Sequence, residues 1–344
     1  MKTDKDWMEL ACKEAEKATG LTSPNPIVGA VAVRGGKLLS SGYHHKAGSG
    51  HAEVECLKKG IDFKGATLYV TLEPCSTHGR TPPCTEAILI AGISKVVIGT
   101  LDPNPSHAGR AVKILQDRGI EVVHGVLKER CWNLNLPFFK WIRDKKPLVV
   151  LKMAMTLDGK IATKSGQSQW ITGPESRQKV QDLRKASDAV MVGGETVRLD
   201  DPSLKVKEDN FAAQPQRYIW SSQTDWNKDL KCFAKDGKSA NVIKPTNKKE
   251  WLAELEKMGQ DQITSLLIEG GGELAASALD AGIVDIVYFF IAPKILLGRD
   301  SRPVIGGNSP DSLAAALELQ NTETSKFGND ILIKGFLSDI WKIY

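Results

Sequence analysis

The sequence predicts an α/β protein of two domains, and three observations lead to this prediction. Short apolar runs typical of strands alternate with amphipathic helical segments along the chain. A charged stretch that ends in a proline, Arg143 to Pro147, interrupts this alternation near the middle, and a new apolar strand follows at once. The length of 344 residues is sufficient for two domains of ordinary size. We therefore predict one domain over residues 1–146 and a second over residues 147–344.

In the first half, each element follows from a local pattern. Apolar residues at helical spacing predict a helix over 5–19, and alternation around Arg34-Gly35-Gly36 predicts a hairpin of strands 27–33 and 37–43. The further elements predicted in the same way are helix 51–59, strand 66–72, helix 84–91, strand 95–100, helix 110–118, strand 120–124 and helix 127–142. This order is typical of a sheet with helical crossovers. It places His51 and Cys84 at helix starts, at one edge of the sheet.

The second half repeats a strand–helix rhythm. The predicted strands are 148–155, 190–192, 218–220, 266–268, 284–292 and 331–337, and the predicted helices are 248–258 and 273–281. Residues 205–215 and 222–240 are polar and irregular, which indicates loops. Glycines at 270–272 stand between a strand and a helix, where exposed amide groups suit a phosphate, although such glycines equally mark tight turns. They do not form G-x-G-x-x-G, so a Rossmann fold is not supported.

The composition is that of a soluble globular protein, with 41% hydrophobic and 25% charged residues. No apolar run approaches the ~18 residues that a membrane helix needs. Acidic residues stand near the N-terminus where a signal peptide needs an apolar core, so we expect a cytoplasmic protein without a membrane partner. Six cysteines in so long a chain do not indicate a disulfide framework.

The net charge of +5 lies in the first half, because residues 1–146 carry 21 Lys and Arg against 15 Asp and Glu, and the rest carry 25 against 26. A nucleic-acid-binding face usually shows a broader basic stripe. Mild positive charge fits a small phosphorylated substrate, and we expect no nucleic-acid partner.

The strongest chemical signal lies in residues 51–84. His51-Ala52-Glu53 is followed by Pro74-Cys75 and, nine residues after Cys75, by Cys84. One imidazole and two thiols can supply three ligands to zinc, and three protein ligands leave the fourth tetrahedral position open for water, which is the catalytic arrangement. H-x-E followed by P-C-x-x-C is the signature of nucleobase deaminases, here with the cysteine spacing widened. His78 lies in the same loop and is expected to face substrate or solvent.

The residues around the ligands have separate tasks in this chemistry. Zinc lowers the pKa of bound water to roughly 7, and Glu53, placed two residues after His51, can take that proton and deliver one to the leaving amine. Cys84 opens a helix, where the dipole favours its thiolate. The alternative is that the thiols and the histidine are incidental, which the order and spacing of the complete motif disfavour.

Further motifs match a known family along nearly the whole chain. In the first half they are Ser23-Pro24-Asn25-Pro26-Ile27-Val28-Gly29, Gly42-Tyr43-His44 and Glu73-Pro74-Cys75, beside the zinc motif. In the second half they are Lys152 to Lys160, Trp170-Ile171-Thr172, Val192 to Val197, Asp200-Asp201-Pro202, Glu269-Gly270-Gly271 and Ala292-Pro293-Lys294. In this order they resemble the bifunctional riboflavin-biosynthesis deaminase/reductases.

The resemblance implies a fold and two activities. The first domain would have a cytidine-deaminase-like three-layer fold and would deaminate a diaminopyrimidinone that carries phosphoribosylamine. The second would have a dihydrofolate-reductase-like fold and would use NADPH to reduce the opened ribosyl chain to ribityl. The implied partners are this pyrimidine ribotide and further copies of the chain, as a dimer or a tetramer.

The resemblance also implies site residues. His51, Cys75 and Cys84 would be the zinc ligands, and Glu53 would be the proton donor. The implied NADP contacts are Ala154, Trp170, Thr196, Asp200, Ser222, Gly271, Gly272, Glu273, Leu274, Ala275, Ala276 and Ser277. The implied contacts to the reductase substrate are Ser168, Arg184, Leu204, Lys207 and Glu269. The family often has arginine where Lys207 stands, and lysine lacks the forked contact to phosphate, so Arg184 is expected to carry most of the phosphate binding.

Two alternatives remain open from the residues. A deaminase of nucleic acid, of the kind that acts on tRNA, would need basic and aromatic side chains in the second half for phosphates and base stacking. That half is slightly acidic. A non-catalytic protein with a structural zinc would have no use for Glu53.

Overall fold

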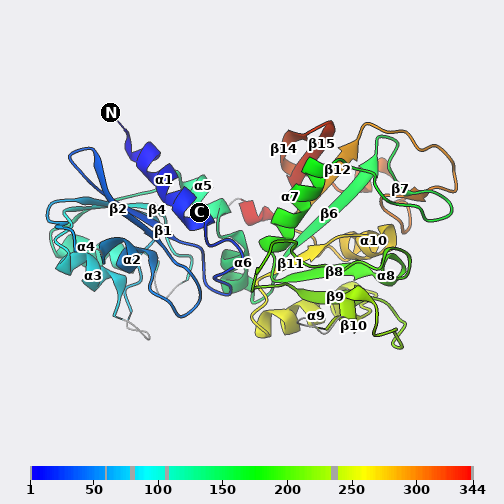
Figure 1. Ribbon diagram of the computed structural model, residues 1–344, viewed down its shortest axis with the longest axis horizontal. Coiled ribbons are helices and arrows are strands. Elements are labelled where there is room, and N and C mark those ends of the chain that lie inside the picture. The colour runs from blue at the N-terminus through cyan, green and yellow to red at the C-terminus, as the bar shows by residue number, and fades with distance from the viewer. Residues whose placement is uncertain (1, 59, 78–81, 105–107, 234–238, 342–344) are drawn as a thin grey trace. The chain divides into compact units, whose positions relative to one another are not determined.

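The computed structural model describes residues 2–58, 60–77, 82–104, 108–233 and 239–341, which form two compact units, Met1–Asp144 and Lys145–Tyr344 (Figure 1). The division falls two residues before the predicted boundary. Lys146 pairs with Glu256 at 3.0 Å, and the carbonyl of Lys145 packs so closely on Gly259 that a Cβ there would lie 2.0 Å from it. These contacts attach Lys145 and Lys146 to the second unit. The assignment of one activity to residues 1–146 and the other to residues 147–344 stays a prediction.

The first unit contains a five-stranded sheet in the order β2-β1-β3-β4-β5. Strands β1 and β2 form the predicted hairpin, β1 pairs antiparallel with β3, and β3, β4 and β5 are parallel. The strands are β1 (Gly29–Arg34), β2 (Lys37–Tyr43), β3 (Thr67–Leu72), β4 (Lys95–Thr100) and β5 (Glu121–His124). The helices are α1 (Asp4–Glu16), α2 (Ala52–Leu57), α3 (Cys84–Ile90), α4 (Arg110–Asp117), α5 (Lys128–Asn133) and α6 (Leu136–Asp144).

Helices cover both faces of this sheet. On one face, apolar side chains of β1, β3 and β4 pack against α2, α3 and α4. On the other, alternate residues of the same strands pack against α1 and α5, where Trp7, Met8 and Cys131 are buried. The period of two along each strand sends successive side chains to opposite helical layers. The first unit is therefore the expected three-layer α/β domain of cytidine-deaminase-like fold.

The predicted single helix over 127–142 is wrong, because the structure has two helices there, α5 and α6. Asn135 lies between them, and its side chain bonds both the N–H and the carbonyl of Ile27, at 2.8 and 2.9 Å. Pro137 follows at the start of α6, and a proline cannot donate the hydrogen bond that a continuous helix needs there. A contact with a residue 108 positions away thus ends the first helix.

The second unit contains an eight-stranded sheet in the order β10-β9-β8-β11-β6-β12-β15-β14. The first six strands of this order, from β10 through β12, are parallel to one another. Strand β15 pairs antiparallel with β12, and β14 pairs antiparallel with β15. The predicted strands of this half are present as β6 (Leu148–Thr156), β8 (Ala189–Gly193), β9 (Gln216–Trp220), β11 (Ser265–Ile268), β12 (Ile286–Ala292) and β15 (Asp330–Phe336). The two predicted helices are α9 (Lys248–Gln260) and α10 (Gly272–Asp280).

Other elements of this unit were not predicted from the sequence. They are β7 (Lys160–Ala162), α7 (Pro174–Lys185), α8 (Gly194–Asp200), β10 (Asn241–Ile243), β13 (Arg302–Pro303) and β14 (Gln320–Phe327), with short 3₁₀ turns at Lys231–Phe233, Leu313–Ala315 and Asp339–Trp341. Strand β14 is an exposed edge strand, which explains why it lacks an apolar alternation. Helix α7 buries only Ser176 and Val180, so its apolar stripe is too narrow to stand out.

The core of the second unit lies on both faces of its sheet. On one face, Trp251 and Leu255 of α9 and Leu274 and Ala278 of α10 pack against β6, β8 and β11. On the other, Val180 of α7 packs against Phe290 of β12. This is the expected reductase-domain fold. In the described part of the chain, no helix combines the length and the apolar character that crossing a membrane requires.

Candidate active sites

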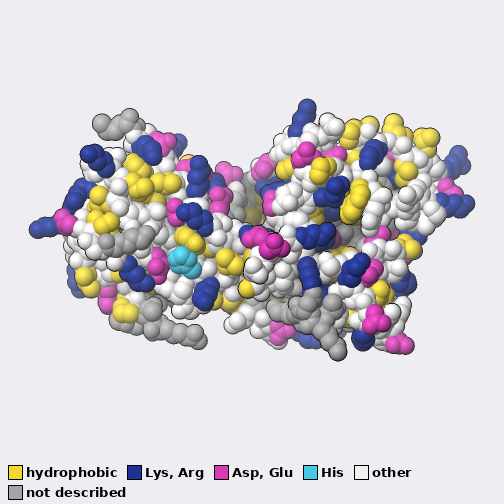
Figure 2. All heavy atoms as spheres, viewed as in Figure 1, with side chains coloured by type: hydrophobic (Ala, Val, Ile, Leu, Met, Phe, Trp, Pro, Cys, Tyr) yellow, Lys and Arg dark blue, Asp and Glu magenta, His cyan; other side chains and the backbone are white. Residues whose placement is uncertain are grey.

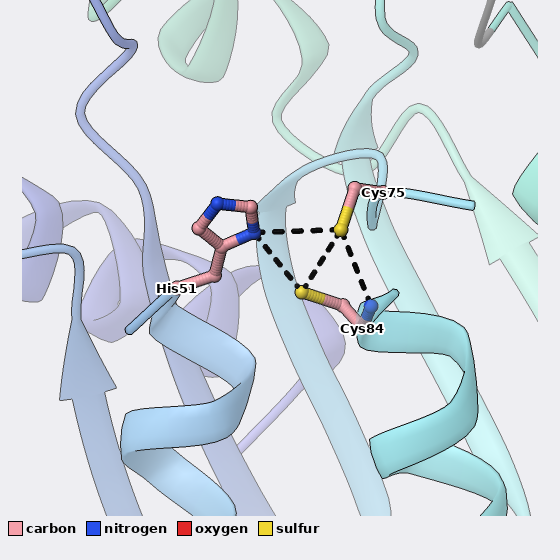
Figure 3. A group of neighbouring side chains, drawn as sticks. All are labelled: His51, Cys75 and Cys84. Carbon is pink, nitrogen blue, oxygen red and sulfur yellow. Dashed lines mark hydrogen bonds between the residues drawn. The ribbon is translucent and has the colours of Figure 1, made fainter. Parts of the chain in front are cut away.

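The metal-binding cluster of the first unit lies where one strand and two helices meet. His51 is the residue that precedes α2, Cys84 is the first residue of α3, and Cys75 follows the end of β3 by three residues. Nδ1 of His51 lies 3.2 Å from Sγ of Cys84 and 3.4 Å from Sγ of Cys75, and the two sulfur atoms are 3.4 Å apart (Figure 3). The structure thus brings together the three residues that the sequence predicted.

The cluster fits a zinc ion. Zinc bonds of about 2.3 Å to sulfur and about 2.0 Å to nitrogen place tetrahedral ligand atoms roughly 3.5 to 3.8 Å apart, close to the separations observed. The two thiols share a proton, because the hydrogen bond with Cys84 lowers the pKa of Cys75 to about 4, while the same bond and burial raise the pKa of Cys84. The Cys84 N–H also donates to Sγ of Cys75 at 3.2 Å. The protein therefore stabilises a thiolate here before a cation adds its own charge.

Glu53 lies beside these ligands in a dry environment. Its side chain is 3% exposed, and its carboxyl group hydrogen-bonds the Cys84 thiol. Burial raises the pKa of Glu53 to about 7, near the value at which a group both accepts and donates protons at neutral pH. Position and proton affinity thus agree with the predicted role as proton carrier.

A second carboxylate holds the loop that carries Cys75. Glu73 is 5% exposed, and its oxygen atoms accept hydrogen bonds from the backbone N–H groups of Asp102, Gly109 and Ala111, at 3.2, 2.9 and 3.0 Å. These bonds join the end of β3 to the segment that leads into α4. Glu73 is therefore a positioning residue for Cys75. His78 lies outside the described residues.

Sequence reasoning missed two polar residues next to the cluster, Asn25 and His44. The His44 ring is 3% exposed and stands edge-on to the His51 ring, 5.5 Å between centroids. Desolvation lowers the pKa of His44, so the ring is neutral and carries one N–H. Its Nδ1 donates to the Gly50 carbonyl at 3.0 Å. Nε2 must then accept from the Asn25 amide, 3.3 Å away. The Asn25 amide oxygen is then turned away from His44. Both residues lie in motifs that match the family, and this match was the sequence signal that could have identified them.

In the second unit, a cavity of about 320 Å³ contains two predicted site residues, Ser168 and Trp170. Ser168 donates to both carboxylate oxygens of Asp200, at 3.0 and 3.2 Å. The Trp170 indole is 61% exposed, and its ring lies 4.6 Å from the Arg177 guanidinium. A predicted substrate contact and two predicted cofactor contacts thus lie close together. Ala154 lies on β6, paired with Phe290 of β12.

Lys294 lines this cavity and Asp158 bonds residues that line it, and neither was predicted as a site residue. Lys294 lines the cavity, and its Nζ donates to the Trp170 carbonyl at 2.8 Å. Asp158 accepts from Thr156 Oγ1 at 2.6 Å and from the backbone N–H groups of Leu296 and Leu297 at 3.1 and 2.8 Å. Asp158 therefore fixes the segment after β12 against the end of β6. Both residues lie in motifs that match the family, 152–160 and 292–294, which was the sequence signal that could have identified them.

The predicted cofactor stretch from Gly271 to Ser277 divides into two parts. Gly271 precedes α10, and its backbone lies against Thr196, with Oγ1 3.6 Å from the position of a Cβ. The first N–H groups of the helix, from Gly272 onward, have no partner within it and suit a phosphate. Three later residues of the stretch support the helix, because Leu274 and Ala275 are in the core and Ser277 accepts from the Trp251 indole at 3.0 Å. These three side chains therefore face other helices and strands, whereas Glu273 is exposed.

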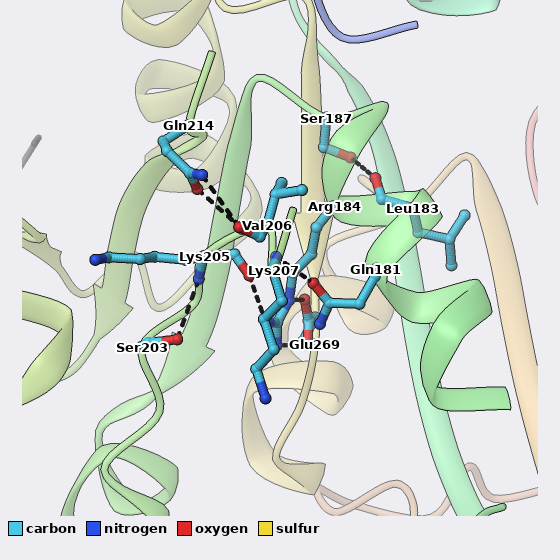
Figure 4. A network of polar contacts seen from close by, with 10 residues as sticks. All are labelled: Gln181, Leu183, Arg184, Ser187, Ser203, Lys205, Val206, Lys207, Gln214 and Glu269. Atoms are coloured by element: carbon cyan, nitrogen blue, oxygen red, sulfur yellow. Dashed lines mark hydrogen bonds and ion pairs between the residues drawn. The ribbon is translucent and has the colours of Figure 1, made fainter. Parts of the chain in front are cut away.

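The predicted substrate residues Arg184 and Glu269 bind each other. The Arg184 guanidinium makes a forked ion pair with the Glu269 carboxylate, with Nη2 2.8 Å from Oε2, and donates to the Lys205 carbonyl at 3.1 Å (Figure 4). Burial alone would raise the pKa of Glu269, but the Arg184 charge and its hydrogen bonds lower it. The remaining members of this group are Leu204, 1% exposed and able to offer only its backbone, and Lys207, which is exposed.

The Arg184 geometry bears on the expected phosphate contact. Three of the five guanidinium N–H donors already bond the protein and Glu269 balances the charge, so only two N–H groups of Arg184 are left for a phosphate in this arrangement. Lys207 is anchored through its backbone N–H to Gln181 Oε1 at 2.9 Å, and its ammonium has no acidic partner within ion-pair distance in the described chain. The exposed cation of this cluster is therefore Lys207.

Comparisons with known proteins agree with these two units. Residues 1–100 match the cytidine and deoxycytidylate deaminase zinc-binding region, and residues 147–333 match the RibD C-terminal domain. The riboflavin biosynthesis protein RibD of Actinobacillus pleuropneumoniae is 43% identical, over 96% of this chain and 94% of its own, and that of Escherichia coli is 37% identical over 96% and 98%.

Solved structures agree over nearly the whole length. A Thermotoga maritima diaminohydroxyphosphoribosylaminopyrimidine deaminase/5-amino-6-(5-phosphoribosylamino)uracil reductase is 35% identical, with a TM-score of 0.84 over 96% of this chain and 97% of its own. One form of Acinetobacter baumannii RibD, also 35% identical, gives 0.86 over 97% and 98%. With the His/Cys/Cys cluster in place, the chain belongs to the RibD family of bifunctional riboflavin-biosynthesis enzymes and joins a zinc-binding deaminase to a reductase that uses NAD(P)H.

Proposed function

We propose that the first unit hydrolyses an amino group from 2,5-diamino-6-(5-phosphoribosylamino)pyrimidin-4(3H)-one, and that the second unit then reduces the ribosyl chain of the product with NADPH to give 5-amino-6-(5-phosphoribitylamino)uracil. The likeness to the Thermotoga maritima deaminase/reductase, whose name states both substrates, supports this assignment. The observation that carries the deaminase half is the buried Glu53 carboxyl against the thiol of the His51, Cys75 and Cys84 cluster. A structural zinc site needs no such group.

The residues of the first unit have distinct tasks in this reaction. Zinc held by the three ligands would acidify a water molecule at its open position. Glu53 accepts one proton from the attacking water and passes it to the leaving nitrogen, so that a carbon–oxygen bond replaces the carbon–nitrogen bond and ammonia departs. Asn25, held by His44, is placed to orient the pyrimidine. Glu73 holds the loop that carries Cys75, so that Cys75 stays close to His51 and Cys84.

The residues of the second unit bind and orient two molecules. NADPH would supply the hydride for the opened ribosyl carbon. We place its pyrophosphate at the start of α10, beside Gly271 and Thr196, and the reacting ends in the cavity lined by Ser168, Trp170 and Lys294. Lys207 binds the substrate phosphate, and Arg184 holds Glu269 in place beneath it. Asp200 fixes the Ser168 hydroxyl.

The two-step assignment is tested by supplying each substrate separately to purified protein. Ammonia release is followed with the diaminopyrimidinone ribotide, and loss of the NADPH absorbance band is followed with the already deaminated ribotide. We expect the first to proceed without cofactor and the second to require it. Deamination of a tRNA hairpin in place of the ribotide would favour the alternative of a nucleic-acid deaminase.

The surface charge bears on that alternative. The face in Figure 2 shows Lys and Arg dispersed among Asp and Glu, whereas a nucleic-acid-binding face usually shows a broad basic stripe.

Replacing Lys207 with arginine should strengthen substrate binding by the reductase. A forked guanidinium binds phosphate more firmly than an ammonium group, and a phosphate remote from the reacting carbon is bound equally in the ground and transition states. We therefore expect the reductase KM to fall about threefold or more with kcat unchanged. Steady-state reduction at varied substrate measures this. Lys257→Arg, an exposed change at the end of α9, should alter neither constant. An unchanged KM in Lys207→Arg would remove this residue from the phosphate site.

The second unit should fold alone and bind the cofactor. It comprises about 200 residues with cores on both faces of its sheet, which is enough for independent folding. A fragment that begins at Lys145 retains the contacts of Lys145 and Lys146 with α9. Thermal unfolding with NADPH at about 100 times its Kd should show stabilisation of roughly 2.7 kcal/mol. A folded fragment without any shift would mean that the cofactor site needs the first unit.

We also propose that the enzyme works in the cytoplasm as a dimer or a tetramer. Reducing conditions keep zinc-binding thiols available, and none of the six cysteines, all of which lie in the described residues, forms a disulfide. The outer side of edge strand β14 and the exposed Leu313 and Leu317 nearby in sequence offer a surface for a second copy. Light scattering of the purified chain measures the oligomeric state.

A further inference from the structure

Three parallel strands of the second unit end side by side, and each is followed by a polar residue or turn. Trp220 at the end of β9 is in register with Gly193 at the end of β8 and with Ile243 at the end of β10. The segments that follow, Gly194 onward, Ser221 to Gln223 and Lys244, therefore leave the sheet at the same edge. The N–H of Ser221 donates to the Ile243 carbonyl at 2.9 Å, which ties two of these segments together.

The proposed pyrophosphate turn adjoins this edge. The Gly193 N–H donates to the Gly270 carbonyl at 3.0 Å, so the glycine turn before α10 lies against the end of β8. On the other side, Ser221 Oγ lies 2.8 Å from the position of a Cβ on Gly194. Neighbouring strands are about 4.8 Å apart, so the ends of β9 and β10 lie roughly 5 and 10 Å further along the sheet from β8. A dinucleotide with its pyrophosphate on α10 can extend its adenosine half over them.

Lys244 is a held cation at the far end of this path. Its Nζ lies 3.0 Å from the centroid of the Trp220 ring, and the Trp220 indole donates to the carbonyl of Pro245, the residue after Lys244, at 2.9 Å. The ring thus limits where the ammonium can go. Desolvation lowers the pKa of Lys244, and the charge of Glu273 in the first turn of α10 raises it, which places the lysine within electrostatic reach of that helix start. The described residues offer Lys244 no acidic partner within ion-pair distance.

Ser222 and Arg198 are the other polar groups at this edge. Ser222 is exposed between Ser221 and Gln223, where its hydroxyl can donate to an anion. Arg198 of α8 is also exposed, but its guanidinium donates to Gln223 Oε1 at 3.0 Å and lies 5.6 Å from the Trp226 ring. Arg198 therefore has a hydrogen bond to the loop, whereas Lys244 has no hydrogen-bond acceptor among the described residues and can turn N–H groups away from the ring toward a ligand.

We propose that Lys244 determines the preference for NADPH over NADH by binding the 2′-phosphate, with the Ser222 hydroxyl as a second donor. The two cofactors differ only in this phosphate, and a cation fixed on an aromatic ring beside the adenosine path is placed to distinguish them. An ammonium group binds phosphate as a point charge, so the preference should weaken at high salt. This inference rests on the proposed function, because it presupposes that NADPH is the cofactor.

Dissociation constants for NADPH and NADH test the proposal without any turnover. They are measured by fluorescence titration of the full-length, zinc-containing chain at about 50 mM and about 300 mM salt. The variant is Lys244→Met, since methionine keeps an apolar stem over Trp220 and removes the charge. We expect NADPH binding to weaken about tenfold and NADH binding to change less than twofold, which corresponds to the loss of a charge-assisted hydrogen bond. The wild-type preference should fall with salt more steeply than that of the variant.

Two further variants complete the test. Helix α9 crosses from the end of β10 back to the start of β11, so Lys257 in its last turn lies at the opposite edge of the sheet, and Lys257→Met should leave both affinities unchanged. Arg198→Met should lower the preference less than Lys244→Met does. Equal losses of NADPH and NADH binding in Lys244→Met, or a preference that disappears only in Arg198→Met, would overturn the assignment of Lys244. A wild-type chain that binds both cofactors equally would contradict the NADPH proposal itself.

Discussion

Replacing Glu53 with glutamine should reduce deamination by about 10³- to 10⁴-fold and leave reduction within twofold of wild type. Loss of a positioned general acid/base costs about 10²- to 10⁴-fold, and one carboxyl here serves both proton transfers. Glutamine keeps the shape of the side chain, so the buried packing against Cys84 should survive. Glutamine cannot accept a proton from water or carry one to the leaving nitrogen. Ammonia release and NADPH oxidation, each on its own substrate, measure the two activities.

The matched control for this variant is Glu55→Gln in the same helix. Glu55 pairs with Lys58 at 2.7 Å near the surface, and such exposed pairs contribute only a few tenths of a kcal/mol. Both activities should therefore remain, and zinc content should stay near one per chain in both variants. Deamination by Glu53→Gln within tenfold of wild type would exclude Glu53 from the mechanism. A parallel loss of reduction in folded, zinc-containing Glu53→Gln would show that the two sites are coupled.

Cys75→Ser should lose zinc and with it deamination, by about 10³-fold or more, because a metal contributes several kcal/mol to reactions of this kind. A hydroxyl is a far weaker zinc ligand than a thiolate, and the hydrogen bond from the Cys84 N–H stabilises an anion at this sulfur. Atomic absorption of protein purified without chelator measures the metal. Reduction should persist, since the reductase residues lie in the other unit.

Cys232→Ser is the control for the chemical change itself. Cys232 is buried in the second unit, whereas the proposed ligands belong to the first, so the substitution tests what loss of a thiol does to folding alone. We expect zinc content and deamination to be unchanged in that variant. Retention of stoichiometric zinc by both Cys75→Ser and Cys84→Ser would contradict the ligand assignment.

The position of the metal cluster could be foreseen because its signals are local. A proline before each cysteine, a histidine before an amphipathic segment and a cysteine at the start of another are features that short stretches of sequence display. His51 does precede α2, and Cys84 does begin α3. Strand β3 ends at the same edge and places Cys75 there, because the connections between strands and helices in a crossover sheet are short.

In the reductase unit, local sequence signals did not predict which site residues contact each other. The family resemblance implied Arg184, Glu269, Ser168 and Asp200 as site residues. Nothing in the sequence indicated which of them pair, as Arg184 does with Glu269, 85 positions away, and Ser168 with Asp200. Such pairings depend on strand order, and the order β8-β11-β6 is not the order along the chain. The expectation that Arg184 would be free for phosphate assumed an unpaired guanidinium.

What the sequence alone determined was the fold class, the two-part organisation and the zinc-binding residues, because periodicity and turn residues report which face of each segment is buried and where it ends. Only the tertiary structure decided which buried faces meet. Asn135 divided a predicted helix through its two bonds to Ile27, and Lys244 acquired a chemical setting only because β9 and β10 end side by side. Periodicity specifies that a side chain is buried or exposed, whereas its partner depends on the packing of the whole sheet.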